Sequence, residues 1–280
     1  SSIMPGKVNP VICESVMMVC CQVIGNGAAT TTAGLGGIGG LLDLSVAMPV
    51  MAACTLDSVN VLTGACGMMV DSLFAGIEPD EERCASLIEG SLAMCLYAAR
   101  LVDQEAAGDA EAGRLLGLLT PIVKSWPSEM GLVANHYAIQ IHGGYGYTRD
   151  FEVEQIYRDN RLNPIHEGTT GIQGIDLLGR KVIFDKTGGI ELLMQRIRET
   201  EARAEDILPE CAAALRTARV TVEQAVDTVR GQNDPAAALA NATQFLSATG
   251  HLVAGWLLTD LATRPGPLND GHKVAARYFA

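Results

Sequence analysis

Residues 84–102 read CASLIEGSLAMCLYAARLV and contain the pattern on which the fold assignment rests. Apolar side chains recur three or four positions apart, at Ile88, Leu92, Cys95, Leu96, Ala99 and Val102. This spacing places them on one face of a helix with 3.6 residues per turn. The stretch therefore predicts a helix over residues 84–102.

Further helices are predicted on both sides of this stretch, over residues 9–24, 50–77, 115–141, 190–208, 211–230 and 235–262. Pro121 and Pro127 punctuate the one over 115–141. The chain is 48% hydrophobic with only 5% aromatic residues, which favours helices over sheets. No strand-like alternation occurs, and the predicted fold class is all-α.

Composition excludes several function classes. The formal charge of −12, with no Lys- or Arg-rich block, argues against a nucleic-acid partner. Eight cysteines without a CxxC pair predict reduced thiols, a cytoplasmic protein and no metal site. Residues 15–42 carry no charge, but polar residues and glycines interrupt the stretch. We therefore expect no membrane span.

The chain changes character near residue 85. Residues 1–76 contain only five charged side chains, whereas acids and bases recur every few positions from Glu78 onward. Such a shift marks a domain boundary or a join between two proteins. We predict three segments: a helical fragment over 1–87, a helical domain over 88–189 and a helical extension over 190–280.

The first chemical motif is SSIMPGKVNP at residues 1–10. It places hydroxyls, an amine and a carboxamide on a turn that leads into a helix N-terminus, where partial positive charge favours a carboxylate. The motif resembles the GSxxMPxKxNP signature of the fumarase/aspartase superfamily, and VICESVMMVCCQVIGN at residues 11–26 resembles class II fumarases.

This resemblance implies roles for four residues. Ser1 would be the catalytic base of a lyase that interconverts fumarate and malate. Lys7 and Asn9 would hold the dicarboxylate, and Glu14 matches an acid on the following helix. The resemblance also implies that residue 1 corresponds to the middle of a fumarase, whose other site residues come from upstream segments and neighbouring subunits.

The second motif is HGGYGYTRDFEVEQIYRDNRLNPIHEGTTGIQG at residues 142–174. Its glycines permit close approach of a backbone to a bulky ligand. Two interpretations of its basic residues, Arg149, Arg158 and Arg161, are open: they pair with phosphates, or they pair with Asp150, Glu154 and Asp159. Glu167 lies in a loop before Gly-Thr-Thr-Gly, near a helix start, where partial desolvation suits a general base.

This second stretch resembles the acyl-CoA dehydrogenases. The resemblance implies that Glu167 removes the α-proton of an acyl-CoA while a hydride passes from the β-carbon to FAD. Gln140, Gly143 and Gly144 match residues that contact FAD across a subunit interface. Thr169 and Gly171 match FAD contacts beside the catalytic loop.

The resemblance begins near residue 88 and continues to the end of the sequence. It implies an acyl-CoA dehydrogenase-like four-helix-bundle domain followed by a C-terminal helical extension, preceded by a long-helix bundle fragment. The family's N-terminal helical domain and β-domain have no counterpart in the sequence, so we expect weak FAD binding.

Three functions compete at this point. The first is a FAD-dependent acyl-CoA dehydrogenase, the interpretation that the longer resemblance and Glu167 favour. The second is a class II fumarase-type lyase that uses Ser1. The third is a non-catalytic helical oligomerisation fragment, because both families assemble through long helices. A homo-oligomer is expected in each case.

Overall fold

The computed structural model describes residues 10–35, 46–76, 81–266 and 269–279. Every regular element within these ranges is a helix, which confirms the all-α fold class. The chain forms two compact units, Ser1–Pro79 and Asp80–Ala280. The three predicted segments, with boundaries at 87/88 and 189/190, stay a prediction.

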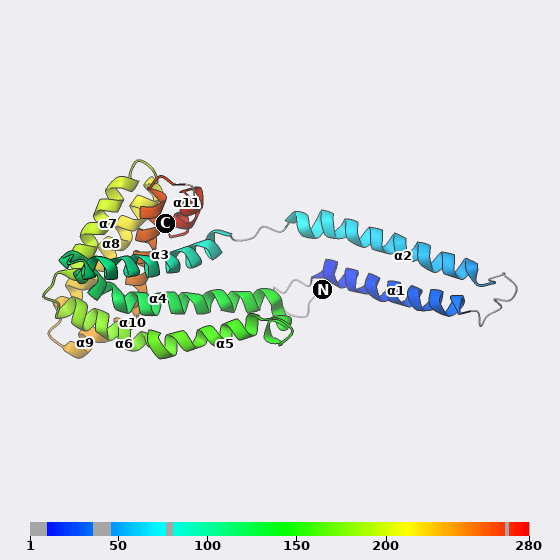
Figure 1. The fold of residues 1–280 in the computed structure, drawn as a ribbon, viewed down its shortest axis with the longest axis horizontal. Helices are drawn as coiled ribbons and strands as arrows, with labels where there is room; N and C mark the ends of the chain where they lie inside the picture. Colours follow the sequence, from blue (N-terminus) through cyan, green and yellow to red (C-terminus); the bar gives the residue numbers. More distant parts are fainter. Residues whose placement is uncertain (1–9, 36–45, 77–80, 267–268, 280) are drawn as a thin grey trace. The chain divides into compact units, whose positions relative to one another are not determined.

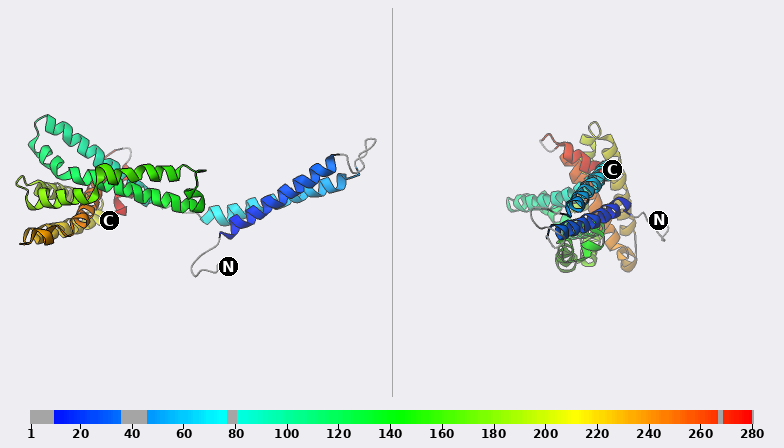
Figure 2. Two further views of the ribbon diagram at one scale, coloured as in Figure 1. Left: turned by 90° about the horizontal axis from the view of Figure 1, so that it is seen from below. Right: turned by 90° about the vertical axis from the view of Figure 1, so that its right-hand side faces the viewer.

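The first unit contains two long helices that lie side by side in Figures 1 and 2, α1 (Val11–Gly34) and α2 (Met48–Met68). A π-helical turn (Met69–Leu73) and a 3₁₀ turn (Phe74–Gly76) follow α2. Asn26 joins the two helices, since its Nδ2 donates to Asp57 Oδ2 at 2.9 Å and to Ser58 Oγ at 3.1 Å. The 9% exposed Asn26 side chain is therefore satisfied inside the pair.

Most apolar side chains of α1 and α2 are exposed in this unit, as at Met17 (64%), Met18 (65%) and Ile24 (72%). Both helical stretches, Val11–Gly34 and Met48–Leu73, are long and apolar enough to cross a bilayer, by length and composition alone. A helix that is apolar all round belongs in a membrane or in the core of a larger assembly. The absence of a membrane span stays a prediction.

The second unit begins with α3 (Glu81–Ala106) and α4 (Ala110–His142), which pack together. The chain continues through η3 (Gly143–Tyr147), α5 (Val153–Asn163), η4 (Pro164–Gly168), α6 (Thr170–Ile175) and η5 (Asp176–Ile183). It ends with α7 (Gly189–Ala204), α8 (Pro209–Arg230), α9 (Pro235–Leu239), α10 (Ala242–Ala262) and α11 (Asn269–Tyr278).

Helix α10 lies at the centre of this unit. Fourteen of its residues are buried, distributed around the whole helix, and it packs against α3, α4, α6, α7, α8 and α11. One hydrophobic core includes Leu118 and Trp126 of α4 together with Leu193 of α7 and Trp256 of α10. Residues from both sides of position 190 therefore share one core.

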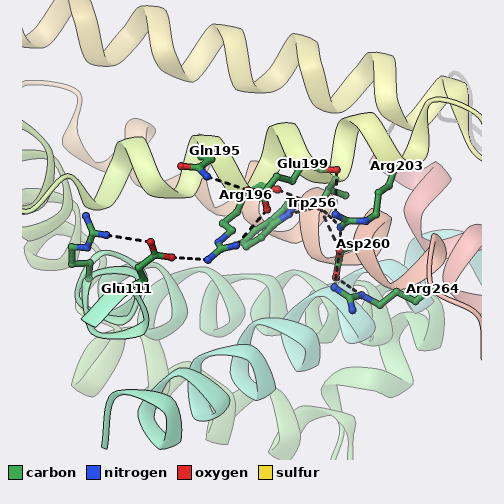
Figure 3. Close-up of polar contacts among 10 residues, drawn as sticks. Glu111, Gln195, Arg196, Glu199, Arg203, Trp256, Asp260 and Arg264 are labelled. Carbon is green, nitrogen blue, oxygen red and sulfur yellow. Dashed lines mark hydrogen bonds and ion pairs between the residues drawn. The ribbon is translucent and has the colours of Figure 1, made fainter. Parts of the chain in front are cut away.

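A polar network fixes α7 against α10 at the edge of this core (Figure 3). Trp256 Nε1 donates to Thr200 Oγ1 at 2.9 Å, and Arg203 donates to the same hydroxyl and to Asp260. Arg264 Nε donates to Asp260 Oδ2 at 2.8 Å, and this hydrogen bond raises the pKa of Arg264. The Asp260 carboxylate of α10 accepts hydrogen bonds from two guanidinium groups, one of them from Arg203 of α7. The network therefore stabilises the packing of α7 against α10.

Three sequence expectations about helix boundaries differ from the structure. Helix α1 continues to Gly34, beyond the predicted end at residue 24. Helix α4 begins at Ala110, because the Asp109 side chain caps it by accepting from Glu111 N and Ala112 N. It continues through both prolines. The predicted helix over 235–262 is divided into α9 and α10.

Asp185 provides a pH-dependent cap at the start of α7. Burial raises the pKa of this carboxyl group, but hydrogen bonds from Thr187 N, Thr187 Oγ1, Gly188 N and Gly189 N outweigh burial and lower the pKa below its usual value. Since the folded-state pKa is below the unfolded one, the ionised carboxylate stabilises the fold above the unfolded pKa. This contribution is lost as pH falls through the folded pKa.

We therefore expect Asp185→Asn to lower the free energy of unfolding by about 1 kcal/mol near neutral pH. The difference from the wild type should shrink as pH falls below about 4, the usual range of an aspartate. Urea unfolding of both proteins at several pH values measures it. A difference that stays constant down to pH values of about 3 contradicts the assigned role.

Candidate functional site

The glycine-rich turn predicted to contact a ligand lies at the C-terminal end of α4. Gln140 is exposed on the last turn of this helix, and Gly143 and Gly144 follow it, also exposed. Gly143 has a φ of 61°, a left-handed conformation that suits glycine. A Cβ on Gly143 or Gly144 would meet no atom within 4 Å. The backbone at these two glycines is thus open to a ligand.

Aromatic side chains surround the same turn. The Tyr145 and Phe151 ring centroids lie 5.9 Å apart, and the His142 and Phe151 centroids lie 5.5 Å apart. Gly146 is buried in the turn, and a Cβ there would lie 2.7 Å from the Ile139 carbonyl oxygen, so only glycine fits. Tyr147 is 85% exposed. The turn is therefore held by local packing, with one free aromatic ring at its surface.

The three arginines of this segment are exposed. The expected ion pairs with Asp150, Glu154 and Asp159 are absent among the described residues, and Asp159 instead accepts a hydrogen bond from Gln155 at 2.7 Å. The salt-bridge interpretation was therefore wrong. The three guanidinium groups therefore keep hydrogen-bond donors exposed, although residues 149–161 contain four acids and three arginines.

The loop that carries Glu167 is strained. Residues Pro164–Gly168 form a π-helical turn, and Thr169 follows with φ 33° and ψ 59°. Thr169 is the one non-glycine residue with a positive φ within the described ranges. A left-handed threonine costs roughly 1–3 kcal/mol and persists only where its surroundings fix it, as they often do at functional sites. The Glu167 side chain lies outside the part that the structure describes.

Side chains of α4 hold this loop in place. Thr170 Oγ1 donates to Glu129 Oε1 at 2.6 Å, and Ser125 Oγ donates to Thr170 Oγ1 at 3.1 Å. A Cβ on Gly168 would lie 2.8 Å from the Asn163 carbonyl oxygen. The sequence did not predict Ser125 and Glu129 as residues of the site, because they are not part of a recognisable motif. Only the packing of the loop on α4 reveals them.

The two groups of predicted ligand contacts lie at opposite ends of α5, which runs beside α4 (Figures 1 and 2). Thr169 and Gly171 adjoin the Ser125–Glu129 turn of α4, whereas Gln140 and the glycines end that helix. Glu129 and Gln140 are 11 positions apart, which is about 16 Å at 1.5 Å per residue. One chain therefore does not bring the two groups to a single phosphate.

The predicted residues of the N-terminal motif fall mostly outside the structure. Ser1, Lys7 and Asn9 lie outside the described residues. Glu14 is exposed on the first turn of α1, and its backbone N–H donates to the Pro10 carbonyl oxygen at 3.0 Å. An acid at this place complements the helix dipole. Within the described ranges, no group of three or more His, Cys, Asp or Glu side chains has the arrangement of a metal site.

Comparison with known families gives three matches along the chain. Residues 83–182 match the family described as acyl-CoA dehydrogenase, C-terminal domain, and residues 193–280 match the acetyl-CoA dehydrogenase C-terminal like family. Residues 1–25 match the lyase family. The composite character expected from the sequence, with similarity to two unrelated families, is thereby confirmed.

Particular relatives agree with these matches. The 3-methylmercaptopropionyl-CoA dehydrogenase of Ruegeria pomeroyi is 35% identical over 187 residues, which cover 63% of this chain and 32% of that protein. A class II fumarate hydratase of Neisseria meningitidis is 42% identical over 107 residues, covering 38% and 22%. A mitochondrial fumarate hydratase of Arabidopsis thaliana is 45% identical over 92 residues, covering 33% and 18%. The chain thus spans about a third or less of each relative.

Proposed function

We propose that the chain is a FAD-dependent acyl-CoA dehydrogenase that forms an α,β double bond in an acyl-CoA thioester. The observation that carries this proposal is the strained loop after Pro164, which lies inside the segment similar to acyl-CoA dehydrogenases. Glu167 is two residues before the left-handed Thr169. Strain of this kind, held by two hydrogen-bonded side chains of α4, is typical of a loop that presents a functional group.

In the proposed reaction, the Glu167 carboxylate takes the α-proton of the thioester. The electron pair of the α C–H bond forms the new double bond between the α- and β-carbons, and the β-carbon loses a hydride. FAD, when bound, would supply the acceptor for this hydride. The roles of the protein are to position the thioester, to hold the proton on the carboxylate and to orient the cofactor.

The residues present fit a dinucleotide with phosphates. Gly143 and Gly144 expose open backbone at the end of α4, and the exposed guanidinium groups of Arg149, Arg158 and Arg161 offer hydrogen-bond donors to phosphate oxygens. Gln140 and these two glycines would contact the diphosphate or adenosine, while Thr169 and Gly171 would contact FAD beside the catalytic loop. The test is reduction of FAD by an acyl-CoA in the reconstituted full chain.

A homo-oligomer is part of the same proposal. In this proposal Gln140, Gly143 and Gly144 of one chain contact the FAD that lies beside the Glu167 loop of a second chain, as the resemblance to acyl-CoA dehydrogenases implies. The apolar side chains of α1 and α2 are also exposed, and in this proposal a second copy of the chain covers them. The cytoplasmic location stays a prediction.

The oligomer is tested by sedimentation of the full chain in buffer without detergent. We expect a mass of at least two chains at micromolar concentration, since apolar helices of this length do not stay solvated. A monomer that remains soluble in the absence of detergent contradicts the proposal. A chain that is soluble only in detergent indicates instead that α1 and α2 insert into a membrane.

A class II fumarase-type lyase is the second candidate function. Its specific support is the match of residues 1–25 to a lyase family, together with 42% identity to a fumarate hydratase over 107 residues. In this proposal Ser1 is the base that converts malate to fumarate, and Lys7, Asn9 and Glu14 bind the dicarboxylate. If neither activity occurs, the third candidate remains, a non-catalytic oligomerisation fragment.

A further inference from the structure

Helix α3 has two apolar faces, and the structure covers only one of them. Leu87, Met94 and Leu101 are buried, with exposed fractions of 8%, 1% and 2%. The other face carries large apolar side chains that are at least half exposed: Ile88 (62%), Leu92 (50%), Leu96 (62%) and Val102 (50%). A contiguous exposed apolar face of this kind marks a surface that another polypeptide covers.

The spacing of this second face matches the seam of a coiled coil. Apolar residues follow one another at intervals of four and three positions, at Ile88, Leu92, Cys95, Ala99 and Val102, and all five are exposed. This alternation is the a/d pattern by which two helices interlock their side chains. We call these five residues, together with the neighbouring Leu96, the α3 stripe. It has the form of a seam for one further helix.

Glu89 and Arg100 lie beside the α3 stripe and indicate the direction of that further helix. They are 11 positions apart, about three helical turns, so both lie on the same side of α3 as Leu96. Neither forms an ion pair or a hydrogen bond with another residue that the structure describes. Both charges are therefore available to a partner.

An antiparallel pair of α3 helices centred on Cys95 joins these charges. At 1.5 Å per residue, Glu89 lies about 9 Å before the centre and Arg100 about 7.5 Å after it, so each Glu89 is nearly level with the partner's Arg100. The partner's Asp103 is about 3 Å from that level, farther than the guanidinium group. A parallel pair would instead place Glu89 level with the partner's Glu89. The charges thus favour the antiparallel arrangement.

We propose that the α3 stripe binds the α3 stripe of a second copy of this chain, antiparallel and with a twofold axis at Cys95. A twofold contact needs one surface that is complementary to itself. The alternating spacing supplies the complementary shape, and the two Glu89–Arg100 pairs supply the complementary charge. This interface belongs to the second unit and is independent of FAD, of Glu167 and of α1 and α2.

The position of Cys95 on the axis permits a direct test by oxidation. Packed helices have axes about 8–10 Å apart and Cα atoms about 2.3 Å from each axis, so facing Cα atoms are roughly 3.5–5.5 Å apart, which overlaps the disulfide range of about 4.4–6.8 Å. The full chain is prepared with its seven other cysteines replaced by alanine. Copper phenanthroline at micromolar chain concentration should then link two chains through Cys95.

Ala106→Cys in a chain without any other cysteine is the matched control. Ala106 is exposed and lies on the same line of α3 as Ile88, five turns farther along. In the antiparallel pair the two Ala106 positions are about 33 Å apart, and the linked yield should be at least about tenfold lower than with Cys95. In a parallel pair, or in random collisions, both chains link equally well. Equal yields therefore overturn the proposal.

A charge within the seam should separate the two chains. Leu92→Lys should lower the yield of the Cys95 link at least about tenfold, because the ammonium group would be buried in the contact. Val220→Lys, at an exposed valine of α8 in the same unit, should leave the yield unchanged. Both positions are exposed, so circular dichroism should report equal helicity. A link that forms equally in the two variants contradicts an interface at the α3 stripe.

Charge exchange tests the direction of the pair. At low salt, Glu89→Arg and Arg100→Glu should each lower the yield of the Cys95 link at least about threefold, and the double variant should restore it. A double variant as poor as either single one overturns the antiparallel pairing. If Cys95 neither links nor reacts with a maleimide, residues of its own chain cover the stripe, and this outcome also overturns the proposal.

Discussion

Glu167→Gln is expected to lower the rate of FAD reduction by an acyl-CoA about a thousandfold, with FAD still bound. Glutamine preserves the shape of glutamate but does not accept a proton at an operating pH near neutrality. A positioned general base contributes roughly 10²–10⁴-fold to such a step. Because the substitution is isosteric and neutral, the strained loop at Thr169 should keep its conformation.

The measurement is anaerobic stopped-flow loss of the visible absorbance of oxidised FAD after addition of octanoyl-CoA. Glu152→Gln is the matched control, since Glu152 is an exposed glutamate of the same segment with no proposed role. It should react at the wild-type rate. Equal rates in Glu167→Gln and the wild type would remove Glu167 as the base. Loss of bound FAD in the variant would show a structural role instead.

Gly250→Ala is expected to have the largest effect on stability, about 3 kcal/mol. An alanine Cβ would lie 2.3 Å from Trp126 Cδ1, 2.7 Å from Cγ and 2.9 Å from Cβ. The Trp126 Cβ is fixed to the backbone of α4, so rotation of the indole cannot relieve all three contacts. Overpacking of this kind costs typically 1–3 kcal/mol and sometimes more. Displacing the indole also breaks its hydrogen bond to His251.

Two controls isolate this effect in urea unfolding. Gly117→Ala lies within α4, where the added Cβ would have Lys181 Nζ as its nearest neighbour at 3.7 Å. It should stabilise the protein by about 0.5–1 kcal/mol through helix propensity. In a Trp126→Ala background, Gly250→Ala should no longer destabilise, because the clash is gone. An equal cost in both backgrounds contradicts the steric explanation.

The fold class was predictable from the sequence, because helical spacing of apolar residues recurs along most of the chain. The helix boundaries were harder to predict than the fold class. The Asp109 cap is a local signal and places the start of α4 at Ala110. Pro121 and Pro127 locally disfavour a continuous helix, yet α4 continues through both. Pro121 is buried, and the surrounding core stabilises the helix in spite of the lost hydrogen bonds.

The candidate site was predictable as motifs but not as geometry. The Gly143–Gly144 turn and the Glu167 loop follow from local sequence, whereas their separation along α4 depends on how α5 packs against it. The roles of Ser125 and Glu129 depend on contacts more than 40 positions away in sequence. Arg149, Arg158 and Arg161 show that opposite charges close in sequence do not always form ion pairs, so proximity in the sequence alone was not enough to predict these contacts.

The central claim is that the chemistry of the chain belongs to the segment similar to acyl-CoA dehydrogenases. One preparation of the full chain, reconstituted with FAD and divided between two assays, tests it most directly. We predict that octanoyl-CoA reduces the bound FAD anaerobically and that malate yields no fumarate. Formation of fumarate from malate, with FAD unchanged by octanoyl-CoA, would contradict the account and assign the function to the N-terminal motif.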